Sequence, residues 1–406
     1  MRTYHKINRK MFSKSITRII VFIVMFFLSI ALITAIGSLA PRIYKGIDEL
    51  PPTIPIQIYE YFTFMASGIE RISYIFPPFF IFLCFLVVFI TMARLIETER
   101  PMIACLATLG YTRNQIAIKY IFFVFILSMI GSILGLIIGH FFIHEILMSV
   151  VTKELRGLPK VAPVFPLFGL ISALVCVVLC FFLTMFIFIQ KFNQVPANLL
   201  KSKPPAAGKK IFLESIPFIW RKMSFKYKST YRNIFRYKIR FILTILTVLI
   251  SCVLVFIGIS LYFSLKQTNP EIMDIILPIS VIISIAAVSL NAIVVFNIIN
   301  INIDERNIEI ATLKVLGYKN KEIAGFIFRE IFILSISGMV LGLPVGYGFM
   351  AFMFDFLRFG GLEFVKWYVF FIVFGLVFLS LLIAIILLVR KLNKTSMDSL
   401  FAGYAS

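Results

Sequence analysis

The chain has 406 residues, 60% of them hydrophobic and 46 of them Phe, and its net charge is +21. A soluble domain carries roughly 45–50% apolar residues, so this composition excludes an ordinary soluble protein. The charge indicates attraction to anionic lipid rather than to nucleic acid, because the basic residues flank the apolar segments. The composition is that of a protein with many membrane-spanning segments.

Eight apolar segments are each long enough to cross a bilayer as a helix of about 20 residues. In chain order they are 19–39, 75–93, 120–143, 165–189, 241–265, 276–301, 331–354 and 367–389. Backbone groups in hydrocarbon must be paired within their own segment, so we predict an all-α polytopic protein with eight transmembrane helices. The first segment follows a basic start, as in a signal peptide, but is long enough to be an uncleaved anchor.

The basic residues predict how the chain crosses the membrane. If the N-terminus is cytoplasmic and the chain crosses eight times, most of the 40 Lys and Arg lie inside. The positive-inside rule therefore predicts that both termini are cytoplasmic. The five cysteines fall in spans or on the cytoplasmic side, so no disulfide is expected.

An internal repeat relates the two halves of the chain. Residues 103–139 match residues 310–346 without a gap, at an offset of 207 residues. Each half would hold four helices, which indicates a tandem duplication with both copies in one orientation. A basic amphipathic segment before each first span is either a helix in the inner interface or a plain positive flank, and we favour the helix. The predicted units are a first four-helix repeat, 1–190, a basic cytoplasmic linker, 191–225, and a second four-helix repeat, 226–406.

Within the repeat, a cytoplasmic segment follows the second span of each half. The pattern in this segment predicts a short helix that ends at a glycine, which is Gly110 in the first copy and Gly317 in the second. A second helix should follow, and in the first copy Thr112 and Gln115 predict a capping box at its start. The apolar stripe along this cytoplasmic segment is explained better by docking of a partner than by a plain turn that leads the chain back into the membrane. The predicted docking residues are Glu99, Arg100, Leu106, Leu109, Gly110, Tyr111, Glu305, Arg306, Glu309, Leu313, Leu316, Gly317 and Tyr318. The predicted helix-packing glycines are Gly131, Gly135, Gly139, Gly338, Gly342 and Gly346.

These segments carry a family resemblance. Asp304-Glu305-Arg306 through Ile323 resembles the region after the second span in FtsX-like, MacB-type permeases of ABC transporters. The first copy is a weaker match, because Pro101 intrudes and its Glu-Arg pair lies one residue nearer to the Gly-Tyr pair. The resemblance covers nearly the whole chain.

One difference from that family is large. Its members usually carry a sizeable extracytoplasmic domain between the first and second spans of a repeat. Here the corresponding loop is short in the first half, 40–74, and can be only a turn in the second half, 266–275. The short loops fit either a naturally minimal member or an engineered one.

The resemblance implies a permease in a bacterial cytoplasmic membrane that lacks its own motor, and the sequence has no G-x-x-x-x-G-K-S/T phosphate loop. A separate ABC ATPase would use ATP and Mg, with two copies per permease chain. The chain itself would bind no cofactor or metal and would not be an enzyme. Its expected function is mechanotransmission, in which ATP hydrolysis drives movement or extraction of a membrane-associated or amphipathic substrate.

Other function classes remain as alternatives. An ATP-driven regulatory complex that acts on a cell-wall hydrolase or sensor shares this architecture, and a separate extracytoplasmic partner would point to it. A secondary transporter is disfavoured because the spans lack deep ionisable groups, and Asn291 and Asn297 are expected to hydrogen-bond between helices. A membrane enzyme is also disfavoured. His140 and His144 could begin a zinc site with the adjacent Glu145, but the sequence offers no third clear ligand.

Overall fold

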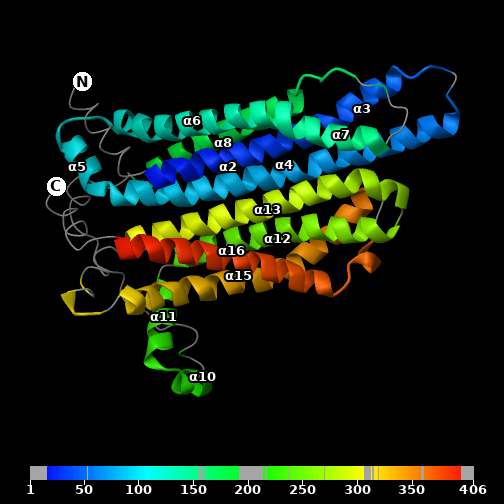
Figure 1. Cartoon of the computed structure of the whole chain (residues 1–406). Helices are drawn as coiled ribbons and strands as arrows, with labels where there is room; N and C mark the ends of the chain where they lie inside the picture. Colours follow the sequence, from blue (N-terminus) through cyan, green and yellow to red (C-terminus); the bar gives the residue numbers. More distant parts are fainter. Residues whose placement is uncertain are drawn as a thin grey trace.

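The fold is a bundle of long helices. The computed structural model describes residues 16–394 except 53, 155–158, 160, 192–213, 215–216, 237, 269, 306–311, 313–314, 319 and 358–360. Over these residues it contains eight helices that are long and apolar enough to cross a membrane. The predicted all-α membrane fold is therefore confirmed, and the helices of the two halves form neighbouring groups (Figure 1).

Each half contributes four of the eight spans. The first half comprises α2 (Ile16–Gly37), α3 (Leu39–Asp48), α4 (Ile56–Thr98), α5 (Arg100–Thr108), α6 (Arg113–Ile138), the π-helical η1 (Gly139–Ile143), α7 (His144–Glu154) and α8 (Leu167–Lys191). α10 (Pro217–Lys222) lies in the segment predicted as the linker, and the second half comprises α11 (Phe225–Arg236), α12 (Lys238–Thr268), α13 (Pro270–Glu305), α15 (Asn320–Leu357), the 3-10 helix η3 (Leu362–Phe364) and α16 (Tyr368–Lys394). Thus α2, α4, α6 and α8 correspond to α12, α13, α15 and α16.

Equivalent helices make equivalent contacts. In the first half α2 packs against α4 and α6, and in the second half α12 packs against α13 and α15. Between the halves, α13 packs against α2, and the equivalent pair, α4 and α12, also packs together. The two second spans, α4 and α13, contact each other as well. The halves are therefore related by an approximate two-fold axis parallel to the helices.

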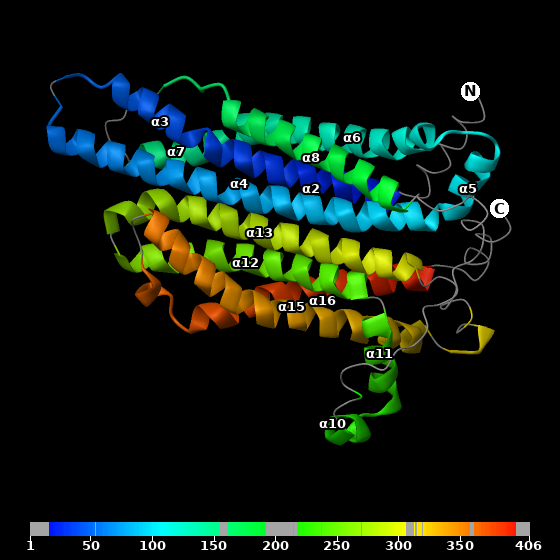
Figure 2. The same cartoon turned by 180° about the vertical axis from the view of Figure 1, so that it is seen from behind.

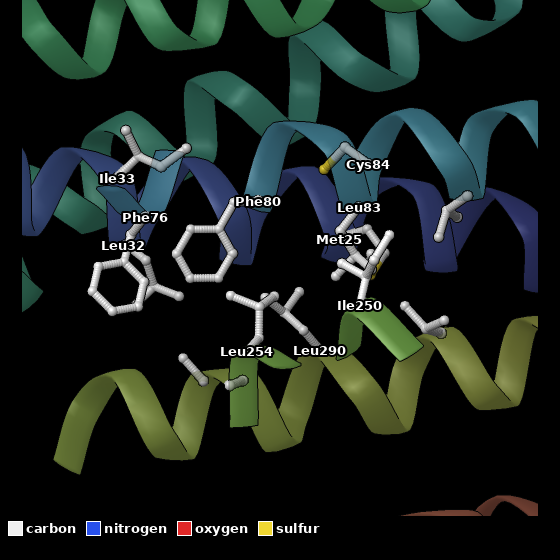
Figure 3. Close-up of a cluster of buried hydrophobic side chains, with 14 of the residues drawn as sticks. Met25, Leu32, Ile33, Phe76, Phe80, Leu83, Cys84, Ile250, Leu254 and Leu290 are labelled. Carbon is white, nitrogen blue, oxygen red and sulfur yellow. The ribbon is translucent and has the colours of Figure 1, made fainter. Parts of the chain in front are cut away.

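Apolar side chains from the first and second spans fill the interface between the halves (Figure 3). The labelled residues in this interface are Met25 and Leu32 of α2, Phe76, Phe80 and Leu83 of α4, Ile250 and Leu254 of α12, and Leu290 of α13, whereas the labelled Ile33 and Cys84 point away from α12 and α13. All of them are buried. Because lipid tails are as apolar as these side chains, close packing rather than the hydrophobic effect holds the halves together inside the membrane.

The segment predicted as a short external loop, 40–74, is mostly helical. It contains α3 and the start of α4, and α3 packs against both α4 and α7. We call α3, residues 56–74 of α4, and α7 the stalk (Figure 2). Tyr44 and Glu70 link two of its helices, with the Tyr44 hydroxyl donating to Glu70 Oε2 at 2.9 Å.

The predicted span 75–93 is only part of α4, which begins at Ile56. Charged Glu70 and Arg71 precede the apolar segment, and Pro77 and Pro78 lie inside the helix. Neighbouring helices can satisfy the backbone groups that a proline frees within a membrane protein, so the helix continues through them. By contrast, α12 ends at Thr268 and α13 begins at Pro270, so the predicted short connection in the second half is confirmed.

Candidate docking elbows

The first elbow, residues 99–112, joins α4 to α6 through the short helix α5. Gly110 has φ +90°, in the left-handed region that glycine adopts without strain. Its N–H donates to Ala107 O at 3.1 Å, and the N–H of Tyr111 donates to Leu106 O at 3.2 Å. These two bonds form a Schellman motif, which satisfies the last carbonyls of α5 and turns the chain.

The following helix, α6, begins as predicted. Thr112 and Gln115 form a capping box, in which the Thr112 N–H donates to Gln115 Oε1 at 3.0 Å. The box pairs backbone donors that the first turn of a helix would otherwise leave without partners. Together the glycine turn and the box fix the angle between α5 and α6.

The predicted docking residues of the first elbow divide into an inner and an outer set. Leu109 is 71% exposed and Tyr111 is 43% exposed, whereas Leu106 is buried in the core. Glu99 points inward, where Tyr120 Oη donates to its Oε2 at 2.7 Å and Lys119 Nζ lies 3.6 Å away. The inner set fastens the elbow to α6, and the outer set forms an exposed apolar tip.

The second elbow, 305–319, repeats the glycine turn between α13 and α15. Gly317 has φ +88°, and Leu316 and Tyr318 on either side of it are 68% and 45% exposed. Glu305 is the last residue of α13. Three further predicted docking residues, Arg306, Glu309 and Leu313, lie outside the described residues. A Cβ added at Gly110 or Gly317 would meet nothing within 4 Å, so backbone conformation rather than crowding favours glycine at both.

Both elbows lie at the same end of the bundle. Figure 1 shows α5, the end of α13 and the start of α15 at the end where α2 begins and α16 finishes. We call this the elbow end, and the opposite end, which carries the stalk, the far end. The arrangement follows from the duplication, because each copy of four spans returns the chain to the side where it started.

The glycine triplets seat the third helix of each half against the first. A Cβ at Gly131 or Gly135 would lie 2.8 Å from a backbone oxygen of α2, and one at Gly139 would lie 2.5 Å from Ala31 O. In the second half, a Cβ at Gly338, Gly342 or Gly346 would approach Val248, Cys252 or Phe256 of α12. All six glycines therefore face the first helix of their own half, and their missing side chains allow the backbones to approach.

The two predicted asparagines bond between helices, as expected. Asn297 Nδ2 donates to Thr91 Oγ1 at 3.0 Å, which links α13 to α4 across the two halves. Asn291 Nδ2 donates to Ser380 Oγ, which links α13 to α16. Both asparagines are buried. Each side chain thus has a structural partner inside the bundle.

At the far end, a residue that the sequence did not single out organises the stalk. Arg42 of α3 donates through Nη1 to Glu145 Oε1 at 2.6 Å and to His144 Nε2 at 3.1 Å. Its Nε donates to Val161 O at 3.0 Å. Because Nε2 of His144 accepts, its Nδ1 carries the proton and faces Ser38 Oγ at 3.0 Å. Among the described residues, no group of three or more His, Cys, Asp or Glu could hold a metal ion.

A comparison with protein-family models gives two matches to one description, FtsX-like permease C-terminal, at residues 74–196 and 281–397. Each match begins within the second span of its half, contains the elbow, and runs past the fourth span. Comparisons with curated proteins and with solved structures gave no match. Such permeases are typically non-catalytic and partner with an ABC ATPase. Since the two matches cover more than half of the chain, this multi-pass membrane protein belongs to the FtsX-like permease family as a duplicated member and is a permease subunit of an ABC transporter.

Proposed function

We propose that this permease receives the movement of two ATPase copies at its elbows and transmits it to the far end of the bundle. There it drives the movement or extraction of a membrane-associated or amphipathic substrate. The observation that carries the proposal is the pair of elbows, which share one glycine geometry and lie at one end of a pseudo-two-fold bundle. An ATPase dimer with the same symmetry would contact both elbows of a single chain.

The exposed tips supply the docking surfaces in this proposal. Leu109 and Tyr111 in the first elbow, and Leu316 and Tyr318 in the second, place apolar side chains around each glycine turn. An apolar tip on a short, capped turn fits a groove on a partner, because the fixed backbone lowers the entropy lost on binding. With one tip per half, one permease chain takes two ATPase copies.

Two features couple the first elbow to the bundle. Glu99 lies between α4 and α5, is bonded to Tyr120 and lies beside Lys119, so the junction of α4 and α5 is held against α6. The helix that enters the elbow, α4, has 43 residues and is therefore about 64 Å long at 1.5 Å per residue. This is about twice the 30 Å thickness of the hydrocarbon core, so a tilt imposed at the elbow also displaces the stalk.

The charge pattern supports a cytoplasmic position for the elbow end, where ATP is available. α11, which precedes the first span of the second half, is rich in Lys and Arg, as the positive-inside rule expects of a cytoplasmic side. The domain boundaries at 190 and 225 belong to the same proposal, because they separate two repeats that would each carry one docking elbow.

Reconstitution with the cognate ATPase tests the proposal. Native mass spectrometry of the complex should give two ATPase copies per permease chain. Leu109→Asp and Leu316→Asp should each lower ATPase binding, and the double variant should abolish it. Ser149→Asp, at an exposed position of the stalk, is the matched control and should bind normally. A single ATPase copy, or full binding by the double variant, would refute the docking role.

A second candidate function is regulation of an extracytoplasmic partner, such as a cell-wall hydrolase or a sensor. The stalk favours it, because it is a helical extension of the first half with exposed Tyr59 and Phe64. In that case ATP turnover by the complex should respond to the partner protein and not to amphipathic substrates added to the membrane.

A further inference from the structure

The segment Pro217–Arg236, which contains α10 and α11, lies beside the helix bundle rather than within it (Figures 1 and 2). We call this segment the basic hairpin. Its sequence holds six Lys or Arg and no Asp or Glu. We propose that the basic hairpin binds the anionic headgroups of phospholipids in the leaflet on the elbow side of the membrane.

The position of the hairpin matches the depth of the headgroups. Both views show α11 crossing the bundle direction close to the start of α12, with α10 displaced sideways from the bundle. α11 packs against α12 and α15, and Thr230 and Ile234 are buried there. The apolar part of α12 begins with Phe241, directly after Lys238 and Arg240. A helix at this level lies along the membrane surface instead of entering it.

The side chains of the hairpin combine cations with aromatic rings. Lys228 Nζ lies 5.6 Å and Arg232 Cζ lies 5.3 Å from the centre of the Trp220 ring. In α10, Lys222 Nζ lies 4.4 Å from the centre of the Phe218 ring, which is 72% exposed. Aromatic rings favour the boundary between headgroups and acyl chains, and the cations beside them are then at the depth of the lipid phosphates.

At least two of the cations in the hairpin are available to a ligand outside the protein. Glu214 pairs with Arg232, with Nε and Oε1 2.7 Å apart, whereas Arg221 and Lys222 are exposed. Each Lys or Arg near an anionic membrane surface raises the affinity about fivefold. A lipid surface fits this arrangement better than the ATPase does, because α5 and the start of α15 lie further toward the elbow end of the bundle than α10 and α11 (Figure 1).

The chain contains two tryptophans, and one of them lies in the hairpin, which gives a direct test. Trp367→Phe leaves Trp220 as the only tryptophan of the full-length permease. The variant is placed in nanodiscs of unlabelled phosphatidylcholine that contain a small fraction of either brominated phosphatidylglycerol or brominated phosphatidylcholine. Bromine atoms at the same acyl position quench fluorescence, so a difference in quenching measures the preference for the anionic headgroup. The matched control is Trp220→Phe, which leaves Trp367 beside the start of α16.

Brominated phosphatidylglycerol should quench Trp220 much more strongly than brominated phosphatidylcholine, and Trp367 should show no such difference. Neutralising Arg221 and Lys222 with Gln in the Trp367→Phe background should lower the preference of Trp220 by up to about 25-fold, at about fivefold for each charge. Lys45→Gln and Lys366→Gln, at exposed positions far from the hairpin, should leave it unchanged. Equal quenching of Trp220 by the two lipids would overturn the proposal. So would the absence of quenching by both, which would assign the hairpin to a protein partner instead.

Discussion

Asn297 on α13 donates a hydrogen bond from Nδ2 to Thr91 Oγ1 on α4, across the interface between the two halves. Both side chains are buried, and the Thr91 hydroxyl in turn donates to Val87 O at 2.7 Å. Each residue lies about two turns before the elbow end of its helix. This polar contact therefore fixes the register of the two helices that lead into the elbows.

The first prediction concerns this contact. Thr91→Val should destabilise the protein by roughly 0.6–1.7 kcal/mol, because it removes one interhelical hydrogen bond within a membrane. Asn297→Leu should have a similar cost, and the double variant should cost less than the two single variants added together. Thermal unfolding in detergent measures all three. Strictly additive costs would mean that the two side chains do not interact.

The second prediction concerns the elbow glycines. Gly317→Val should strain the turn by about 1–2 kcal/mol, because a β-branched residue is unfavourable at φ +88°. The bundle should remain folded while Leu316 and Tyr318 are displaced, so ATPase binding and coupled ATP turnover should fall. Gly110→Val should act in the same way. Gly348→Ala is the matched control, because an added Cβ meets nothing there. Normal coupling in both elbow variants would exclude the role proposed for the turns.

The third prediction concerns the packing glycines. Gly139→Ala should destabilise the bundle by about 1–3 kcal/mol, because its Cβ would lie 2.5 Å from the backbone oxygen of Ala31. Gly338→Ala should behave similarly against Val248. Gly348→Ala, also within α15, should be neutral or slightly stabilising. Thermal unfolding in detergent compares the three, and equal stability would show that the close approach is not required.

The fourth prediction concerns the orientation of the bundle. Of the five cysteines, Cys105 in α5 is exposed and the other four are buried. An impermeant maleimide should therefore label the native chain only from the cytoplasmic side, and bound ATPase should protect it. In a Cys105→Ser background, Ser149→Cys on the stalk should be labelled only from outside. Labelling of Cys105 in intact cells would reverse the proposed topology.

The fifth prediction concerns the fastening of the first elbow. Glu99→Gln should destabilise the protein by about 3 kcal/mol, because the Lys119 side chain, 3% exposed, would lose its counter-charge. Tyr120→Phe removes one hydrogen bond to a charged group and should cost less, about 1.5 kcal/mol. Thermal unfolding gives the stability of both variants. Their coupled ATP turnover should fall even at temperatures where they remain folded, and full coupling would show that the Glu99 contacts only support the fold.

Much of this architecture could be predicted from the sequence because the membrane restricts the choices. A long apolar segment in hydrocarbon must be a helix, so the eight spans followed from composition alone. The glycine of each elbow was predictable because only a few backbone conformations end a helix, and most of these favour glycine. Helix ends depend on local backbone conformation, so Gly110, Gly317 and the Thr112 capping box could be predicted without knowledge of the tertiary structure.

The stalk could not be predicted in the same way, because its stability comes from tertiary contacts. Arg42 and Glu145 are far apart in sequence, and neither shows a pattern that predicts their pairing. The inward direction of Glu99 was missed for a related reason. A charged residue at a helix junction is usually solvated, and only its contact with Tyr120 places it inside. The division of the first elbow into an inner fastening and an outer tip was therefore visible only in the structure.

The number of residues between each elbow glycine and the packing glycines that follow it limits how the two copies could diverge. The same number of residues separates Gly110 from Gly131 as separates Gly317 from Gly338, and Gly131 lies about halfway along the apolar span 120–143. One inserted residue would rotate the glycines by about 100° away from the first helix of that half. Either copy could therefore change most of its side chains after duplication, but neither could change the number of residues between its elbow glycine and its packing glycines.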